Sequence, residues 1–220
     1  MLFRSGQLPP QRRGIRSYVI REGRMTPGQQ RAFDEAWPQY GLEPEAVGDF
    51  LSQCDKAVLE IGFGMGDSLF EQAEANPDVT YIGIEMHRPG CGHLMQRAQK
   101  AELLNIRVIR ADAVLILKGV PDASLDRVQI FFPDPWPKKR HHKRRLINAE
   151  LLHLLAAKLH AGGIVHIATD WENYAEWIVD VFQDAASFEQ VPPPSRPETK
   201  YERRGQRLGH KVADLAYRRI

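Results

Sequence analysis

One aspartate lies between two prolines in the segment Phe131-Phe132-Pro133-Asp134-Pro135-Trp136-Pro137. Because proline fixes its own φ angle, this turn holds the Asp134 carboxylate stiffly beside the Trp136 ring. The next eight residues, 138–145, contain six Lys or Arg and no acid. Cations bind the phosphates of a polyanion, so an acid joined to a cationic run is suited to chemistry on a base within such a chain.

Acidic residues lie at or just past the ends of several short apolar runs that are typical of buried strands. They are Glu60, Glu85, Asp112, Asp134 and Asp170. In a doubly wound parallel sheet, ligands bind beyond the carboxyl ends of the strands. The series therefore predicts one ligand crevice at that edge of the sheet. If the ligand contains an adenine, Asp112 would accept from its exocyclic amine. Taken alone, Asp112 has an alternative interpretation as the N-cap of the next helix.

A glycine-rich turn, Gly62-Phe63-Gly64-Met65-Gly66, follows the first of these runs. A dinucleotide site needs Gly-x-Gly-x-x-Gly with phosphate on the next helix N-terminus, but the sixth position here is Asp67. A carboxylate there would repel phosphate, whereas it suits S-adenosylmethionine, whose two cationic groups outweigh its one carboxylate. Glu85 fits an acceptor for two ribose hydroxyls, a role that both cofactor classes share.

Strand patterns alternate with helix patterns along most of the chain. Strands are expected at 57–62, 79–85, 106–110, 125–132 and 163–169, with helices near 69–73, 91–104, 113–118, 144–160 and 172–184. Two further strands, at 188–191 and 209–217, would flank a loop rich in Pro and Arg, one of them antiparallel. This order predicts an α/β fold with a doubly wound, Rossmann-like sheet that is mostly parallel, with one antiparallel strand near the C-terminus.

Basic residues are concentrated in three segments. Residues 1–31 carry a net charge of +6, residues 138–145 carry +6 and residues 200–220 carry +5. Because the whole chain has a formal net charge of +2, the remainder carries −15. This segregation favours binding of a phosphate backbone from several sides. Residues 1–32, rich in Arg, Gly, Pro and Gln, are expected to form a basic flexible arm, and residues 33–220 a single domain.

Other classes of protein and site are disfavoured by the composition. No run of about 18 apolar residues exists, and the N-terminus lacks the apolar region of a secretory signal, so a cytoplasmic protein without a membrane contact is expected. Cys54 and Cys91 have no metal-ligand spacing and are interpreted as ordinary thiols. The adjacent His141 and His142 would need further ligands to converge on them, and we predict no metal site.

Five motifs, taken together, resemble those of the bacterial tRNA (guanine-N7)-methyltransferases, a family of class I S-adenosylmethionine-dependent enzymes. The motifs are Leu59-Glu60-Ile61-Gly62-Phe63-Gly64-Met65-Gly66, Gly83-Ile84-Glu85, the segment 132–145, Thr169-Asp170-Trp171-Glu172-Asn173-Tyr174 and Thr199-Lys200-Tyr201-Glu202. The resemblance spans roughly residues 55–205 in the order of the family. The first 32 and last 15 residues lie outside it, so the roles expected there depend on charge alone.

The resemblance assigns expected roles to individual residues. Cofactor contacts are expected at Glu60, Gly62, Gly64, Gly66, Glu85, Asp112 and Asp134, and Asp134 is also the expected catalytic residue. Substrate contacts are expected at Lys138, Asp170, Thr199, Lys200, Tyr201 and Glu202, and RNA contacts at Arg140, His141, His142, Lys143, Arg144 and Arg145. The implied reaction transfers a methyl group from S-adenosylmethionine to N7 of guanine in tRNA, at guanine-46 of the variable loop, and forms 7-methylguanosine.

Purine N7 carries a lone pair and no proton, so it can attack a sulfonium methyl without a strong general base. We expect Asp134 to orient the guanine or to offset its growing positive charge, with Asp170 as a second acceptor. Trp136 either packs under the cofactor loop or stacks on a base. The expected partner is tRNA rather than DNA, and the protein is expected to be a monomer or a homodimer.

Three rival functions follow from the same residues. A non-enzymatic RNA-binding protein would explain the cations but not Glu60, Glu85 and the glycine turn. An exocyclic-amine methyltransferase would have two prolines between acid and aromatic residue, whereas Asp134-Pro135-Trp136 has one. A nicotinamide dehydrogenase is disfavoured by Asp67.

Overall fold

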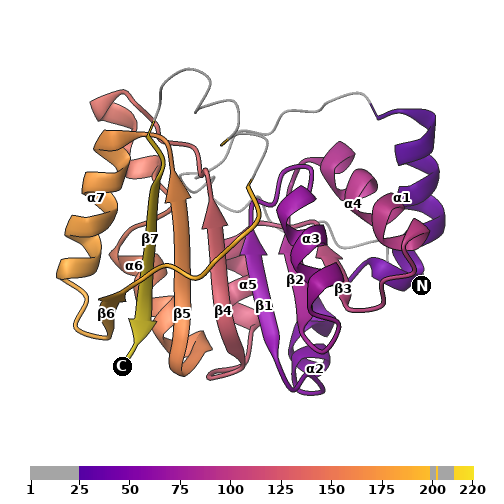
Figure 1. The fold of residues 1–220 in the computed structure, drawn as a ribbon, viewed down its shortest axis with the longest axis horizontal. Coiled ribbons are helices and arrows are strands. Elements are labelled where there is room, and N and C mark those ends of the chain that lie inside the picture. The colour runs from indigo at the N-terminus through magenta and orange to yellow at the C-terminus, as the bar shows by residue number, and fades with distance from the viewer. Residues whose placement is uncertain (1–24, 199–201, 203–210) are drawn as a thin grey trace, which may run out of the picture.

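A single seven-stranded sheet runs through the molecule (Figure 1). The computed structural model describes residues 25–198, 202 and 211–220. The strands are β1 (Ala57–Ile61), β2 (Thr80–Ile84), β3 (Ile106–Ile109), β4 (Leu125–Phe131), β5 (Leu159–Thr169), β6 (Phe188–Val191) and β7 (Ala213–Arg219). They lie in the order β3-β2-β1-β4-β5-β7-β6. The order reverses between β1 and β4, which is the switch point where doubly wound sheets bind ligands.

Strand directions agree with the predicted fold class. β1 is parallel to β2 and β4, and β4 is parallel to β5. β7 is antiparallel to both of its neighbours, β5 and β6. It is therefore the one strand that runs against the other six of the described sheet, and the expected antiparallel strand near the C-terminus is confirmed. Apolar, β-branched sequence on the central strands explains why both of their faces are buried.

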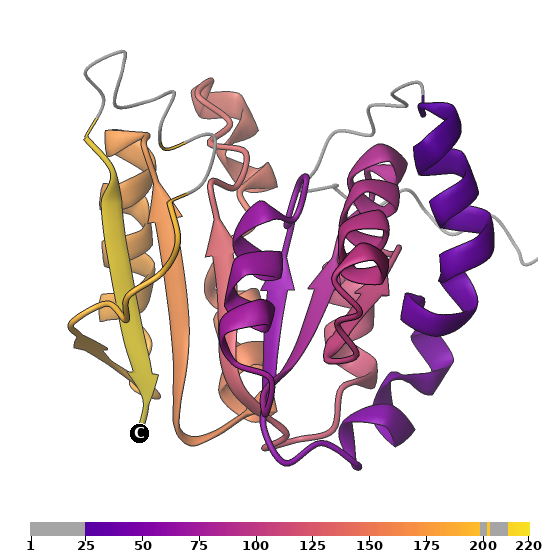
Figure 2. The same cartoon turned by 45° about the vertical axis from the view of Figure 1, so that its right-hand side comes forward.

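Helices cover both faces of the sheet (Figure 2). They are α1 (Pro27–Tyr40), α2 (Val47–Leu51), α3 (Asp67–Ala75), α4 (Arg88–Lys100), α5 (Ala113–Gly119), α6 (Ala149–Lys158) and α7 (Glu172–Gln183), with 3-10 helices η1 (Pro44–Ala46) and η2 (Lys139–Arg144). One apolar cluster packs α2, α5, α6 and α7 on one face, and a second packs α1, α3 and α4 on the other. The described helices include none long and apolar enough to cross a membrane.

Several boundaries differ from the sequence expectation. Helix α1 begins at Pro27, within the expected basic arm of residues 1–32, because proline is well suited to the first turn of a helix. Residues 139–144 form the short helix η2, and α6 begins only at Ala149, where Asn148 caps it by accepting from the Leu151 amide. β5 begins at Leu159, and a register shift opposite β4 separates its first residues from the predicted 163–169.

Polar side chains form a row across the middle of the sheet, on the face that carries α3. Gln129 of β4 is in register with Glu60 of β1 and with His166 of β5, and all three are buried. Gln129 exchanges amide hydrogen bonds with Gln72 of α3. Beside α3 this face is crossed by the extended segment Pro192–Glu198, here called the crossing segment, which passes over β7, β5 and β4 (Figures 1 and 2).

Candidate functional site

The glycine turn leaves β1 and enters α3 at the carboxyl edge of the sheet. Gly62, Gly64 and Gly66 all have positive φ angles, of 76°, 60° and 77°, which L-residues with side chains rarely adopt. The Gly62 amide donates to the Ile84 carbonyl oxygen at 2.8 Å, which ties the turn to the end of β2. A Cβ added to Gly62 would meet no atom within 4 Å. The turn therefore presents bare backbone to the space beyond the strand ends.

Glu85 follows β2 and holds this turn in place. Its Oε2 accepts from the Gly64 amide and its Oε1 from the His87 amide, each at 2.9 Å. A carboxylate oxygen has two lone pairs, so each can accept a second hydrogen bond. The geometry thus fixes the Glu85 carboxylate at the switch point while leaving it able to bind ligand hydroxyls.

Glu60 on β1 is a buried carboxylic acid beneath the same turn. It is 3% exposed, and its Oε2 has no hydrogen-bond partner among the described residues. Burial, with Glu85 nearby, raises the pKa of Glu60 to about 8, against the opposing charge of Arg196. An unpartnered acceptor at this place is suited to a cationic ligand group, since such a group supplies the missing donor.

Asp112 begins helix α5 as its N-cap. Its Oδ1 accepts from the Val114 amide at 2.9 Å, which is the alternative interpretation given to this residue from the sequence. The cap occupies one oxygen and fixes the side chain where β3 leads into α5. A contact to adenine stays a prediction for this carboxylate.

Asp67 stands in a different electrostatic setting from the one expected. Its Oδ1 accepts from Nη1 of Arg97 at 2.5 Å, and that guanidinium lies 4.0 Å from the Phe70 ring centroid. Because Arg97 offsets its charge, Asp67 repels phosphate less than the sequence argument assumed. The argument from Asp67 against a dinucleotide is correspondingly weaker.

Asp134 lies on an exposed turn directly after β4. The residues two positions before and two positions after it, Phe132 and Trp136, have positive φ angles of 52° and 47°. Phe132 extends the pairing with β5, since its amide donates to the Ala168 carbonyl oxygen at 2.7 Å. Two left-handed residues in such a short stretch cost energy, and strain of this kind is typical of functional turns.

Arg145 supports this turn from within the protein, which corrects its expected place among the RNA contacts. It is 2% exposed, and its Nε donates to the Pro135 carbonyl oxygen at 3.0 Å. Its Nη2 donates to Oδ1 of Asn173 at 2.7 Å, and the guanidinium lies over the rings of Tyr174 and Trp177. A cation enclosed in this way is not available to a phosphate, so Arg145 connects the Asp134 turn to α7.

The other cations of the basic run form an outward-facing cluster on η2, which we call the η2 cluster. Its exposed members are Lys138, Lys139, Arg140, Lys143 and Arg144. The Arg144 guanidinium lies 4.8 Å from the Trp136 ring centroid, and His141 meets that ring edge-on. Trp136 therefore packs against the η2 cluster itself. Partial burial and the neighbouring cations lower the pKa of His141.

His142 differs from its neighbours in the run. It contacts Trp177 edge-on, and its Nε2 is buried without a hydrogen-bond partner in the described structure. Among the described residues, no group of three or more His, Cys, Asp or Glu side chains is placed to hold a metal.

The expected substrate residues are only partly described. Asp170 follows β5, the neighbour of the strand that leads to Asp134, and is half-buried. Thr199, Lys200 and Tyr201 lie outside the described residues. Glu202 is buried, and its two carboxylate oxygens accept from Arg196.

Two described cations of the C-terminal basic segment, Arg218 and Arg219, are also placed differently from the expectation. Because β7 is antiparallel, its end lies at the edge of the sheet opposite the glycine turn (Figure 1). Arg218 pairs there with Glu189 at 2.6 Å, and Arg219 donates to the Ala156 carbonyl oxygen. These two cations therefore lie at the end of the sheet that is opposite the candidate site.

Three polar residues whose side chains are buried near the site were missed from the sequence. They are Gln129, His166 and Arg196. Gln129 and His166 interrupt apolar strands, which is a detectable signal. Arg196 lies in a Pro-rich loop, where an arginine usually faces solvent, and no pattern indicates its burial.

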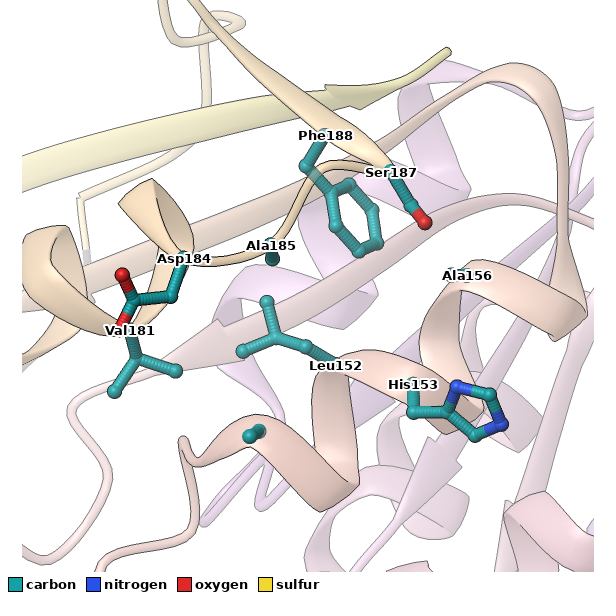
Figure 3. Close-up of a pocket in the computed structure, with 9 residues that line it drawn as sticks. Leu152, His153, Ala156, Val181, Asp184, Ala185, Ser187 and Phe188 are labelled. Atoms are coloured by element: carbon teal, nitrogen blue, oxygen red, sulfur yellow. The ribbon is translucent and has the colours of Figure 1, made fainter.

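One pocket lies away from all of these residues. Figure 3 shows it between α6, α7 and the start of β6, with Leu152 and Phe188 on its wall. Its volume is about 170 Å³. Since α6 leads into the amino end of β5, this pocket is at the edge of the sheet opposite Asp134. It takes no part in the candidate site.

Three features define a Rossmann-like methyltransferase: the glycine turn after β1, Glu85 at the end of β2, and an antiparallel β7, which is sixth in the spatial order of the sheet. Solved structures share this fold: the aminoglycoside resistance methyltransferase NpmB1 has a TM-score of 0.56 at 16% identity, covering 78% of this chain and 91% of its own. The 16S rRNA methyltransferase KamB has a TM-score of 0.56 at 18% identity, covering 78% and 92%.

Sequence comparison narrows this class. A family model described as "Putative methyltransferase" matches residues 55–215. The tRNA (guanine-N(7)-)-methyltransferase of Alkalilimnicola ehrlichii is 51% identical, covering 94% of this chain and 94% of its own. The corresponding protein of Halorhodospira halophila is 50% identical, covering 94% and 96%. The chain belongs to the tRNA (guanine-N(7)-)-methyltransferase family.

Proposed function

We propose that this protein transfers a methyl group from S-adenosylmethionine to N7 of a guanine in tRNA and forms 7-methylguanosine. The observation that carries the proposal is the joining of two sites at one edge of the sheet. Glu60, Glu85 and the glycine turn lie together on the neighbouring strands β1 and β2, where they would bind the cofactor, and Asp134 leads from the next strand, β4, into the η2 cluster. The names of the relatives support the substrate class. The family resemblance favours guanine-46.

The pocket residues fit S-adenosylmethionine group by group. Glu60 has a buried oxygen without a donor, and the ammonium of the cofactor supplies one. Glu85 would accept from the ribose hydroxyls, as it already accepts two backbone amides. Gly62 leaves open space in which the cofactor could lie against the turn. Asp112 would accept from the adenine amine of the cofactor. When bound, the cofactor supplies an electrophilic methyl group on a sulfonium.

Asp134 would act on the guanine rather than on the cofactor. N7 bears no proton, so the protein needs to align the purine and compensate for the positive charge that it gains. An exposed carboxylate on a strained turn can accept from the N–H edge of guanine without first losing a structural partner. Asp170, at the end of the neighbouring strand, would be a second acceptor.

The η2 cluster would position the tRNA through its phosphates. Contacts to phosphate fix the register of a nucleic acid but read no sequence. The cluster begins four residues after Asp134, so phosphates bound there bring a nearby base to the turn. Arg145 contributes indirectly, because it holds the turn in place from inside.

Methyl transfer from labelled S-adenosylmethionine to bulk tRNA tests this proposal. We expect label in 7-methylguanosine after nucleoside mapping, and its loss from a transcript in which guanine-46 is replaced by adenine. N6-methyladenine as the product would overturn the assignment of the acceptor atom. Calorimetry adds a second test, because a protein that binds tRNA but gives no heat with S-adenosylmethionine would be an RNA-binding protein only.

A further inference from the structure

The crossing segment covers the part of the sheet that no described helix covers on that face. α3 packs over Gln129 through Gln72, whereas the crossing segment passes over β4, β5 and β7 (Figures 1 and 2). His166 lies fully buried on this part of the face. An extended segment has no internal backbone hydrogen bonds, so contacts with the rest of the molecule must fix its place.

Arg196 is the side chain that fixes the crossing segment. It is 4% exposed, and its Nη1 lies 2.6 Å from Oε2 of Glu202. Its Nη2 donates to the second carboxylate oxygen of Glu202 at 3.2 Å, so this pair is bidentate. Its Nε donates to Oδ2 of Asp214 on β7 at 2.9 Å. One buried guanidinium thus joins the crossing segment to Glu202 and to the sheet.

The same guanidinium packs on the end of β4. It lies 5.0 Å from the ring centroid of Phe131 and 5.9 Å from that of Phe132. These residues directly precede Pro133 and Asp134, so Arg196 packs against the start of the candidate catalytic turn. The cation–π contacts and the bidentate pair together fix the plane of the guanidinium, which a lysine ammonium could not do.

His166 holds Asp214 in the orientation that Arg196 needs. Its Nε2 lies 2.6 Å from Oδ1 of Asp214, while its Nδ1 has no partner among the described residues. Burial alone would raise the pKa of Asp214, but the hydrogen bond from His166 and the charge of Arg196 lower it. Asp214 is therefore ionised, with one oxygen bound by each neighbour.

We propose that Arg196 is a positioning residue for methyl transfer: it anchors Glu202, and with it the end of the expected substrate motif, to the strand ends beside Asp134. This inference rests on the proposed function. It also changes the role of Glu202 from a direct substrate contact to an anchor, because both of its oxygens accept from a buried guanidinium.

The net charge of the group formed by Arg196, Glu202 and Asp214 separates a positioning role of Arg196 from a purely electrostatic one. Arg196 with two carboxylates leaves one net negative charge, which does not oppose a purine that becomes cationic. Replacing Arg196 with methionine would add to the negative charge and, by charge alone, would favour the cationic purine. Positioning predicts the opposite, since misplacement of the substrate by about 1 Å can cost about 100-fold in rate.

The test compares Arg196→Met, Arg196→Lys and the control Arg218→Met in the full chain, with tRNA methyl transfer as the readout. We expect R196M to lower kcat about 100-fold and to leave the Kd for S-adenosylmethionine within about threefold. R196K should fall between R196M and wild type. R218M breaks the exposed ion pair between Arg218 and Glu189. Arg218 lies on β7, the strand that carries Asp214, but at its far end, so both parameters should stay unchanged.

Each other result contradicts the inference. If R196M keeps wild-type kcat, or loses kcat and cofactor affinity in parallel, Arg196 does not position the substrate. Should R196M fail to fold, Glu202→Leu decides, because leucine cannot accept from Arg196 and the substitution leaves the Arg196–Asp214–His166 contacts. Wild-type kcat in E202L would refute the inference. Wild-type protein that transfers no methyl group to tRNA would instead refute the proposed function itself.

Discussion

Asp134 lies on an exposed, strained turn, so its removal is expected to affect chemistry more than folding. Asp134→Asn keeps the shape and removes the charge. We expect kcat to fall about 100- to 1000-fold, as for the loss of one group that stabilises transition-state charge, while the calorimetric Kd for S-adenosylmethionine changes little. Asp122→Asn, the same change on an exposed aspartate before β4, should leave both unchanged. Parallel losses of kcat and cofactor affinity in D134N would contradict the assignment.

Glu60 should make the stability of the protein depend on pH. Its pKa rises from 4.5 to about 8 on folding, so the folded state keeps a proton that the unfolded state releases between these values. The free energy of unfolding should therefore fall from about pH 4.5 to about pH 8 and then level off. Glu60→Gln imitates the protonated acid, so it should match wild type near pH 5 and exceed it above pH 8.

Chemical denaturation at both pH values checks this difference. Glu71→Gln, at an exposed position of α3, reports the effect of the same substitution without burial. A gap between wild type and E60Q that is the same at both pH values would show that Glu60 is not held protonated.

Single residues show where sequence reasoning works and where it does not. Glu85 and Asp134 could be placed at strand ends because an acid directly after an apolar run has few other places to lie, whereas Glu60 lies within β1. Arg144 and Arg145 could not be told apart, although one lies over Trp136 on the surface and the other is buried against Tyr174. That difference arises from the packing of α7 against the turn, which involves residues about 30 positions away.

At the scale of elements, the glycine turn depends on a close approach of helix α4. A Cβ added to Gly90 would lie 1.9 Å from the Gly64 carbonyl oxygen. Gly90→Ala should therefore displace the turn, destabilise the protein by about 1–3 kcal/mol and weaken S-adenosylmethionine binding at least about tenfold. Thermal melts and calorimetry measure the two effects.

Gly119→Ala at the end of α5 is the matched control. Its added Cβ meets no atom within 4 Å, so stability should stay constant or rise by up to about 1 kcal/mol, with cofactor binding unchanged. Wild-type cofactor affinity in G90A would show that the turn does not depend on this contact.

Most elements could be predicted because each parallel strand is an apolar run stopped by glycine or an acid. The elements that differed have weaker patterns. In η2 the charges conceal a 3-10 helix, and α6 begins later than its apolar residues suggest because Asn148 caps it. The crossing segment has no periodicity, so neither its path over the sheet nor the burial of Arg196 can be derived from local sequence.

At the scale of the whole molecule, the η2 cluster should govern the salt dependence of tRNA binding. Each phosphate contact adds about 0.7–0.9 to the slope of log K against log salt concentration. Replacing Lys139, Arg140, Lys143 and Arg144 with alanine should weaken binding and make that slope less steep, measured by filter binding at several salt concentrations.

Lys56→Ala with Lys118→Ala provides the control for this prediction. Both residues are exposed, and both precede strands at the opposite edge of the sheet. Their loss should leave the slope unchanged. If the slope of log K against log salt concentration stays the same without the η2 cluster, other cations bind the tRNA phosphates.

Strand order gives this architecture a definite sequence of assembly during synthesis. β6 joins the sheet through β7, which follows it in the chain, so β6 stays unpaired until residues 213–219 have left the ribosome. The strands that lead to the glycine turn, Glu85 and Asp134 are synthesised far earlier. A nascent chain can thus pair β1 to β5 while Asp214, and with it one anchor of Arg196, is still missing.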